Sequence, residues 1–171
     1  MKDKYDEPNF VDITPGKTES NSDQLEEEIR ALCSEQPFAV LATQGEGQPY
    51  TSLISFSVSE NLGHLIFSTP ARSRKYNLIN KNRKVSILID NRAQQPKSIN
   101  LIRAVTITGA ARILADSGEV EHWSKLLISR HSYLKKFIQS PSSSLILVEI
   151  EEYFYVRQFQ EVYQWVPGSR S

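Results

Sequence analysis

The stretch F-S-T-P-A-R-S-R-K, which spans Phe67–Lys75, is the most informative part of the sequence. It closes an apolar strand pattern with two hydroxyl side chains, Ser68 and Thr69, before a proline turns the chain. Three cationic residues then follow within four positions, namely Arg72, Arg74 and Lys75. Hydroxyls and cations gathered at one turn are what a phosphate monoester needs, so this turn is the first candidate site.

Ser73 stands where a short helix over residues 73–82 is predicted to begin. The start of a helix offers free backbone N–H groups and a partial positive charge, and both favour a bound phosphate. Arginine adds a planar fork of donors, and lysine adds a point charge. Short basic clusters are also common as solvated turns, so this stretch alone leaves both interpretations open.

The amino-acid composition makes two classes of partner, nucleic acids and membranes, unexpected. Lysine plus arginine and aspartate plus glutamate each number 20 among 171 residues, so the net charge is zero. Nucleic-acid-binding surfaces normally carry a basic excess, and no nucleic-acid partner is expected. No apolar run approaches the roughly 20 residues that span a bilayer, so no membrane partner is expected either.

The N-terminal sequence M-K-D-K-Y-D-E-P-N-F is polar and lacks the apolar segment of a signal peptide, so a cytoplasmic location is expected. Cys33 is the only cysteine, which excludes an intramolecular disulfide and a multi-cysteine metal site. It falls on the apolar side of a predicted helix and is expected to be a buried, inert thiol. The three histidines show no metal-ligand spacing, and no metal is expected.

The sequence predicts one domain over residues 22–166, preceded by a polar arm at 1–21 and followed by a polar tail at 167–171. Asp23 followed by Glu26 predicts the start of the first helix. A later helical region is predicted between about residue 116 and residue 139, with a break near residues 130–132.

Most of the remaining chain has the pattern of short strands separated by turns. The predicted strands cover residues 38–43, 50–59, 64–69, 85–89, 99–114, 145–159 and 162–166. Gly109 interrupts the longest pattern and predicts a bulge or a close backbone approach. We expect a mainly β protein, a small closed barrel with peripheral helices; an open α+β sheet is the alternative.

The order of these segments is more specific than any one of them. F-A-V-L-A-T, G-Q-P-Y-T-S-L-I-S-F, L-I-F-S-T-P-A-R-S-R-K-Y-N-L, V-S-I-L-I and A-V-T-I-T-G-A-A-R-I-L follow one another between Pro37 and Leu114. This order resembles the FMN-binding split-barrel superfamily of pyridoxamine 5′-phosphate oxidase. The resemblance implies a six-stranded antiparallel, Greek-key-like split barrel.

The resemblance also implies a set of cofactor-binding residues. The phosphate clamp of the superfamily falls on Ser68, Thr69, Arg74 and Lys75. The strand along the flavin ring, which contacts it through backbone groups, falls on Ser52, Leu53, Ile54 and Ser55. The superfamily is usually a homodimer with FMN at the interface, and the nearest candidates to reach the partner's flavin are Arg103, Tyr163 and Trp165.

This chain departs from true pyridoxamine-phosphate oxidases at their characteristic positions. Serine stands at 52, where those enzymes carry arginine, and at 57, where they carry a substrate-contacting lysine. The chain ends V-P-G-S-R-S and lacks their C-terminal arginine–histidine signature. A vitamin B6 oxidase is therefore not expected. A haem-utilising branch places a histidine ligand in its C-terminal region; here no histidine follows His131, which is one candidate.

The leading hypothesis is an FMN-dependent oxidoreductase that passes hydride or electrons between a reduced nicotinamide or deazaflavin and a small acceptor. No acid–base constellation is evident, so no catalytic residue is assigned, and the cofactor would carry the chemistry. Three alternatives stay open: a flavin-binding or storage module without turnover, a haem-binding relative, and a structural homodimer with a vestigial pocket.

Overall fold

A closed ring of antiparallel strands forms the centre of the molecule in the computed structural model, which describes residues 19–157 and 161–168. The strands are β1 (Phe38–Thr43), β2 (Tyr50–Val58), β3 (His64–Pro70), β4 (Lys84–Asp90), β5 (Ala104–Ile113), β6 (Ser143–Arg157) and β7 (Glu161–Trp165). They pair in the order β3-β2-β1-β4-β5-β6-β7, and an additional pairing of β3 with β6 closes a six-stranded barrel. The predicted split barrel is therefore confirmed.

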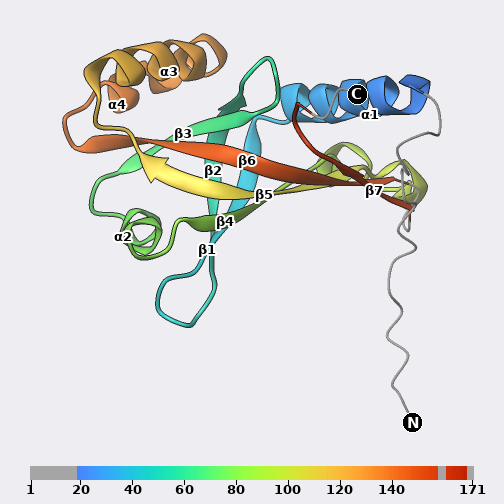
Figure 1. Cartoon of the computed structure of the whole chain (residues 1–171), viewed down its shortest axis with the longest axis horizontal. Coiled ribbons are helices and arrows are strands. Elements are labelled where there is room, and N and C mark those ends of the chain that lie inside the picture. Colours follow the sequence, from blue (N-terminus) through green and yellow to red (C-terminus); the bar gives the residue numbers. More distant parts are fainter. Residues whose placement is uncertain (1–18, 158–160, 169–171) are drawn as a thin grey trace.

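The longest strand, β6, holds the two parts of the sheet together. Its first half pairs with β3 and closes the barrel, while its second half pairs with β7 beyond the barrel. The neighbouring strand β5 follows β6 along both halves. Figure 1 shows β5 and β6 running together along the long axis of the molecule.

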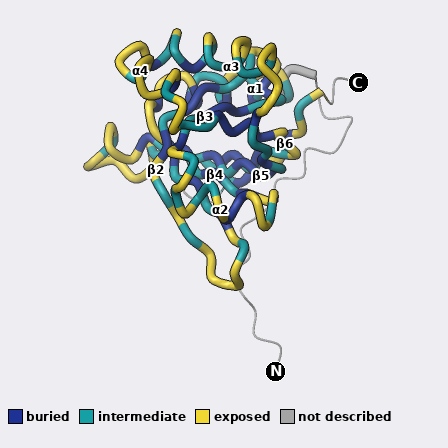
Figure 2. Tube along the Cα trace, turned by 90° about the vertical axis from the view of Figure 1, so that its left-hand side faces the viewer, coloured by how far each residue is buried: buried dark blue, intermediate teal, exposed yellow. Residues whose placement is uncertain are grey.

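Among the described residues, four α-helices surround this barrel: α1 (Glu19–Glu35), α2 (Arg74–Lys81), α3 (Ser117–Arg130) and α4 (Lys135–Ile138). Three short 3₁₀ turns lie at η1 (Arg92–Gln94), η2 (Ile99–Leu101) and η3 (Ser132–Leu134). Helix α3 packs against β2, β3 and β6, whereas α2 packs against β1, β3 and β5. Figure 2 shows buried residues gathered inside the ring of strands, with α3 above it and α2 below.

The core follows from the alternation of side chains along the strands. Buried residues of α1 join the barrel interior in one apolar cluster, which includes Ile29, Leu32, Phe56, Phe67 and Ile107. A second cluster fills the space between the β3–β6 pair and α3 with α4; it includes Ile66, Leu127, Ile138 and Leu147. Cys33 is buried as predicted, and this burial raises the pKa of its thiol to about 12.

Gly109 confirms the predicted irregularity in β5. The register between β5 and β6 shifts between Thr108 and Gly109, which marks a bulge. A Cβ at Gly109 would lie 2.3 Å from the carbonyl oxygen of Glu149. The backbones of the two strands therefore approach each other more closely than any other residue type allows at this position.

Two predicted boundaries are wrong. The first helix begins at Glu19 rather than near Asp23. The strand predicted to begin at residue 99 begins at Ala104, because the preceding residues form the η2 turn. The buried side chain of Asn91 holds this turn by accepting a hydrogen bond from the Arg103 N–H (2.7 Å) and donating to the Leu101 carbonyl.

The predicted division into domains stays a prediction. Most of the polar arm and residues 169–171 of the tail lie outside the described residues. In the described part of the chain, no helix is long and apolar enough to cross a membrane.

Candidate functional site

Strands β2 and β3 pair over only three residues and then part. Phe56, Ser57 and Val58 pair with β3, whereas residues 50–55 pair with β1 alone. No strand in the described part of the chain pairs with the other edge of β2 over residues 50–55. Backbone N–H and C=O groups along an unpaired strand edge are free to bind a ligand. The predicted ring-binding residues 52–55 lie on this open edge.

The end of β3 turns directly into α2. Thr69 is buried, and its hydroxyl lies 2.8 Å from the hydroxyl of Ser73. Ser73 is the N-cap of α2 and accepts a hydrogen bond from the Tyr76 N–H. The predicted helix start is therefore confirmed, and Thr69 contacts the capping residue.

The two cations of the predicted clamp lie on the first turn of α2. The guanidinium of Arg74 lies over the ring of Tyr50, 4.9 Å from its centroid. Lys75 is half-buried, and burial lowers the pKa of its ammonium group. Across the residues that the structure describes, neither side chain forms a salt bridge with a carboxylate. First-turn amides of a helix also lack intrahelical acceptors, so several donors face outward at one place.

Two buried hydroxyls close to this turn have no hydrogen-bond partner among the described residues. One belongs to Ser52 on the open edge of β2. The other belongs to Ser143, which pairs with Pro70 at the end of β3. Buried hydroxyls are normally hydrogen-bonded, so two unsatisfied ones at one end of the barrel are unusual. Together with Lys75, which has no carboxylate partner in the described part of the chain, they fit a polar ligand that approaches between β2 and β3.

Ser68 lies beside the same turn but faces β6, where its hydroxyl donates to the Ser144 carbonyl (3.4 Å). Leu53 and Ser55 point outward from β2, and Leu53 is 64% exposed. Ile54 lies in the barrel core. The predicted clamp and ring-binding residues thus come from three adjacent elements, β2, β3 and α2.

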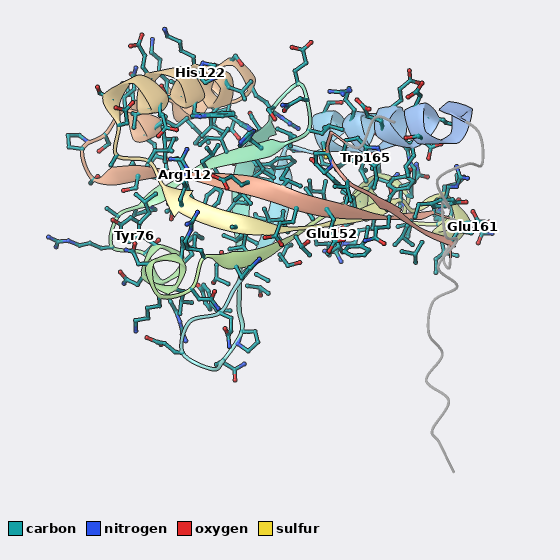
Figure 3. All side chains as sticks on the ribbon, viewed as in Figure 1. Tyr76, Arg112, His122, Glu152, Glu161 and Trp165 are labelled. Atoms are coloured by element: carbon teal, nitrogen blue, oxygen red, sulfur yellow. The ribbon has the colours of Figure 1, made fainter. Side chains whose placement is uncertain are left out.

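Arg103 and Trp165 lie elsewhere in the same chain. Trp165 pairs with Tyr153 on β6, whereas Thr69 pairs with Ser144 of that strand, about 30 Å away at a rise of about 3.3 Å per residue. Figure 3 shows Trp165 and Tyr76 of α2 well apart along the molecule. Arg103 forms a salt bridge with Glu35 (3.5 Å). Any contact of these two residues with a ligand at the clamp would come from a second copy of the chain.

His131, the histidine named for haem ligation, is buried with both ring nitrogens in contact with protein atoms. Its Nε2 lies 2.8 Å from the Phe56 carbonyl, so it carries the proton, and Nδ1 lies 3.4 Å from the Tyr133 hydroxyl. The described residues contain no group of histidine, cysteine, aspartate and glutamate side chains that could hold a metal ion.

Comparison with known families follows from this geometry. The sequence profile of pyridoxamine 5′-phosphate oxidase matches residues 25–157. The chain belongs to this family. The match covers all six strands of the barrel and ends before β7, and it includes the open edge of β2 and the first turn of α2. No curated protein matches the chain.

Solved structures of the same fold come from several bacteria. A Clostridium acetobutylicum protein related to general stress protein 26 has a TM-score of 0.66 at 18% identity, covering 84% of this chain and 94% of that one. A haem-binding protein from Mycobacterium smegmatis has a TM-score of 0.72 at 16% identity, covering 82% and 57%. Campylobacter jejuni ChuZ has a TM-score of 0.73 at 16% identity, covering 85% and 61%. This chain therefore spans little more than half the length of the last two proteins.

Sequence reasoning missed two residues of this candidate site. Tyr50 contacts Arg74, and Ser143 supplies an unsatisfied hydroxyl beside the turn. Both come next to the clamp only through strand pairing and helix packing, so no local pattern could identify them.

Proposed function

We propose that this protein is an FMN-binding oxidoreductase that works as a homodimer. It would pass hydride or electrons between a reduced nicotinamide or deazaflavin and a small acceptor. The proposed cofactor site lies between β2, β3 and α2, where the hydrogen-bond donors converge. Vitamin B6 oxidation is not proposed, because Ser52 and Ser57 are the wrong residue types for that reaction.

The environment of Lys75 is the observation that most directly supports the proposal. A half-buried ammonium group with a lowered pKa and no carboxylate partner in the described chain is costly unless an anion completes its environment. Arg74 and the free amides of the first turn of α2 lie beside it. A phosphate monoester satisfies all of these donors at once, and FMN ends in such a group.

The open edge of β2 suits the other end of the same ligand. Its backbone groups over residues 52–55 would hydrogen-bond the rim of the flavin ring, and Ser52 would add a hydroxyl. FMN, when bound, supplies hydride and electron transfer. The chain's own residues would hold the phosphate, fix the ring against β2 and exclude water. Hydride transfer requires no protein nucleophile, which fits the absence of an acid–base pair here.

The outward face of the sheet supports a second copy as partner. Val40 of β1 pairs with Leu53 on one side and with Leu88 of β4 on the other, so three apolar side chains form a row. Phe38 and Leu53 are 48% and 64% exposed. An exposed apolar row of this kind is typical of an interface. In such a homodimer, Arg103 stays the candidate to reach the flavin of the other copy, whereas Trp165 is buried against Tyr153 in the core of its own chain.

Haem binding is the alternative with an observation in its favour, because the Mycobacterium smegmatis neighbour is a haem-binding protein. His131 is buried, and its unprotonated Nδ1 faces the Tyr133 hydroxyl, so iron binding would require Tyr133 to move away or the contact of Nε2 with the Phe56 carbonyl to break. His64 and His122 are more accessible, and both pack against Trp123. A flavin-storage role differs from the proposal only in lacking turnover.

The test is the absorption spectrum of the purified full-length protein, saturated with FMN and passed through a gel-filtration column. Visible flavin bands that remain with the protein, and that NAD(P)H or reduced deazaflavin bleaches, would support the oxidoreductase. Bands that remain but are not bleached by any donor would support storage. A colourless protein that gains a Soret band with haemin would contradict the FMN proposal.

Two variants locate the binding site. Lys75→Ala should weaken FMN retention strongly, because it removes the half-buried charge. Lys125→Ala is the matched control, since Lys125 is 72% exposed on α3 and forms a salt bridge with Glu121. Equal FMN retention by the two variants would show that the clamp lies elsewhere.

A further inference from the structure

The loop between β1 and β2, residues 44–49, packs along α2. Lys81 Nζ lies 2.5 Å from the Glu46 carboxylate, and the Asn82 side-chain amide donates to Gln44 (2.9 Å). A Cβ at Gly45 would lie only 3.0 Å from the Leu78 carbonyl oxygen. The C-terminal half of α2 is therefore fixed to this hairpin.

A separate contact joins the hairpin to the other end of α2. Tyr50 is the first residue of β2, and its ring lies under the guanidinium of Arg74, 4.9 Å from the carbon atom Cζ. Arg74 itself is exposed, and it forms no salt bridge within the described residues. Stacking on a ring face leaves the N–H groups at the rim of a guanidinium free to bind an anion.

We propose that Tyr50 is a positioning residue for Arg74. The ring holds a long and flexible side chain in one orientation before the ligand arrives, so less conformational entropy is lost on binding. This inference rests on the proposed function, in which Arg74 binds the FMN phosphate. The β1–β2 hairpin thereby determines the geometry of a clamp that belongs to α2.

Two other roles of Tyr50 make different predictions. If the ring touched the flavin directly, its removal would weaken binding whether or not Arg74 is present. If the ring only supported the hairpin, its removal would lower the unfolding temperature without a specific effect on the phosphate. A double-mutant cycle separates these roles, because it measures the coupling between two side chains.

The experiment measures the FMN dissociation constant of the full chain by fluorescence titration for the wild type, Tyr50→Leu, Arg74→Ala and the double variant. Tyr50→Leu should weaken FMN binding about two- to fivefold, the effect of one cation–π contact. The same substitution should have no further effect in the Arg74→Ala background. Tyr50→Phe, which keeps the ring, should restore wild-type affinity.

Riboflavin, which lacks the phosphate, serves as the second probe. Its affinity should be the same in the wild type and in Tyr50→Leu, because Arg74 then has no phosphate to bind. Tyr50→Met replaces the leucine variant if thermal unfolding shows that the latter does not fold.

Three results would overturn the inference: unchanged FMN affinity in Tyr50→Leu, an equal loss with and without Arg74, or an equal loss for riboflavin. Each of them leaves the proposed function standing if the wild type binds FMN. A wild-type protein that binds no FMN would overturn both.

Discussion

The hydroxyl of Thr69 lies 2.8 Å from the hydroxyl of Ser73, although one residue belongs to β3 and the other caps α2. Thr69 is almost fully buried, so water cannot replace this contact. The contact fixes where α2 starts relative to the barrel. Because Arg74 and Lys75 follow Ser73 directly, it also fixes the position of the clamp.

Replacing Thr69 by valine should therefore destabilise the protein with little change in shape. The variant loses the bond to Ser73, and we expect the free energy of unfolding to fall by about 1 kcal/mol. Urea denaturation measures this change. Thr69→Ser keeps the hydroxyl and is the control; a valine variant as stable as the wild type would show that the contact contributes nothing.

Flavin binding should depend on the ionisation of Lys75. Burial lowers the pKa of its ammonium group, and a phosphate prefers the protonated form. FMN should bind most tightly below this lowered pKa. Its affinity should fall as the pH rises through the lowered pKa toward about 10.4, the pKa of a free lysine. Titrations across this range measure the effect. Lys75→Arg should remove the pH dependence of FMN affinity, because arginine stays charged. If this variant showed the same pH dependence as the wild type, the dependence would belong to another group.

The same ionisation has the opposite effect on the stability of the ligand-free protein. A lowered pKa means that the unfolded chain holds the proton of Lys75 more tightly than the folded chain does. Its contribution to the free energy of unfolding should rise with pH between the lowered pKa and about 10.4. The difference in the free energy of unfolding between the wild type and Lys75→Met, measured at increasing alkaline pH, isolates this contribution. A difference that falls as the pH rises would contradict the prediction.

Gly109→Ala should be among the most disruptive single substitutions in the barrel. The new Cβ would lie 2.3 Å from the Glu149 carbonyl, and backbone atoms cannot move aside without opening the β5–β6 pair. We expect a loss of about 3 kcal/mol in the free energy of unfolding. Gly118→Ala is the control, because Gly118 lies on the first turn of α3 and its Cβ would meet only the Asp116 side chain. Similar stabilities of the two variants would argue against the close approach.

Leu53→Asp should dissociate the proposed homodimer. The substitution puts a charge at the most exposed end of the apolar row formed with Val40 and Leu88, and a charge buried without a partner opposes association. Light scattering coupled to gel filtration should then give the mass of a monomer. Tyr133→Asp is the matched control, since Tyr133 is 68% exposed on η3 and lies outside this row. The proposal fails if the wild type is already a monomer.

Local patterns in the sequence were enough to locate most of the fold. The strand at residues 38–43 and the N-cap Ser73 agree with the structure, because alternation and capping are local properties. The region before Ala104 was misassigned as strand. Its apolar residues satisfy a strand pattern, but the buried Asn91 side chain holds this segment as a turn, and that contact depends on tertiary structure.

The candidate site was only partly predictable for the same reason. The hydroxyls and cations at the end of β3 are adjacent in sequence and could be found together. The open edge of β2 could not, because it depends on how far β2 and β3 stay paired. The contact between Tyr50 and Arg74 joins two elements whose approach is set by the packing of α2 on the hairpin.

The pairing of β3 with β6 has a consequence for how the protein is made. Ser68 and Ser144 meet across this pair although they are 76 residues apart in the chain. Contacts between such distant segments form late and slowly in folding. On a ribosome, the barrel must therefore stay open until the first half of β6, which pairs with β3, has been synthesised. Pro70 and Ser143 come together only at this closing step, so a ligand bound at the adjoining turn between β3 and α2 would stabilise the newly made chain only late in folding.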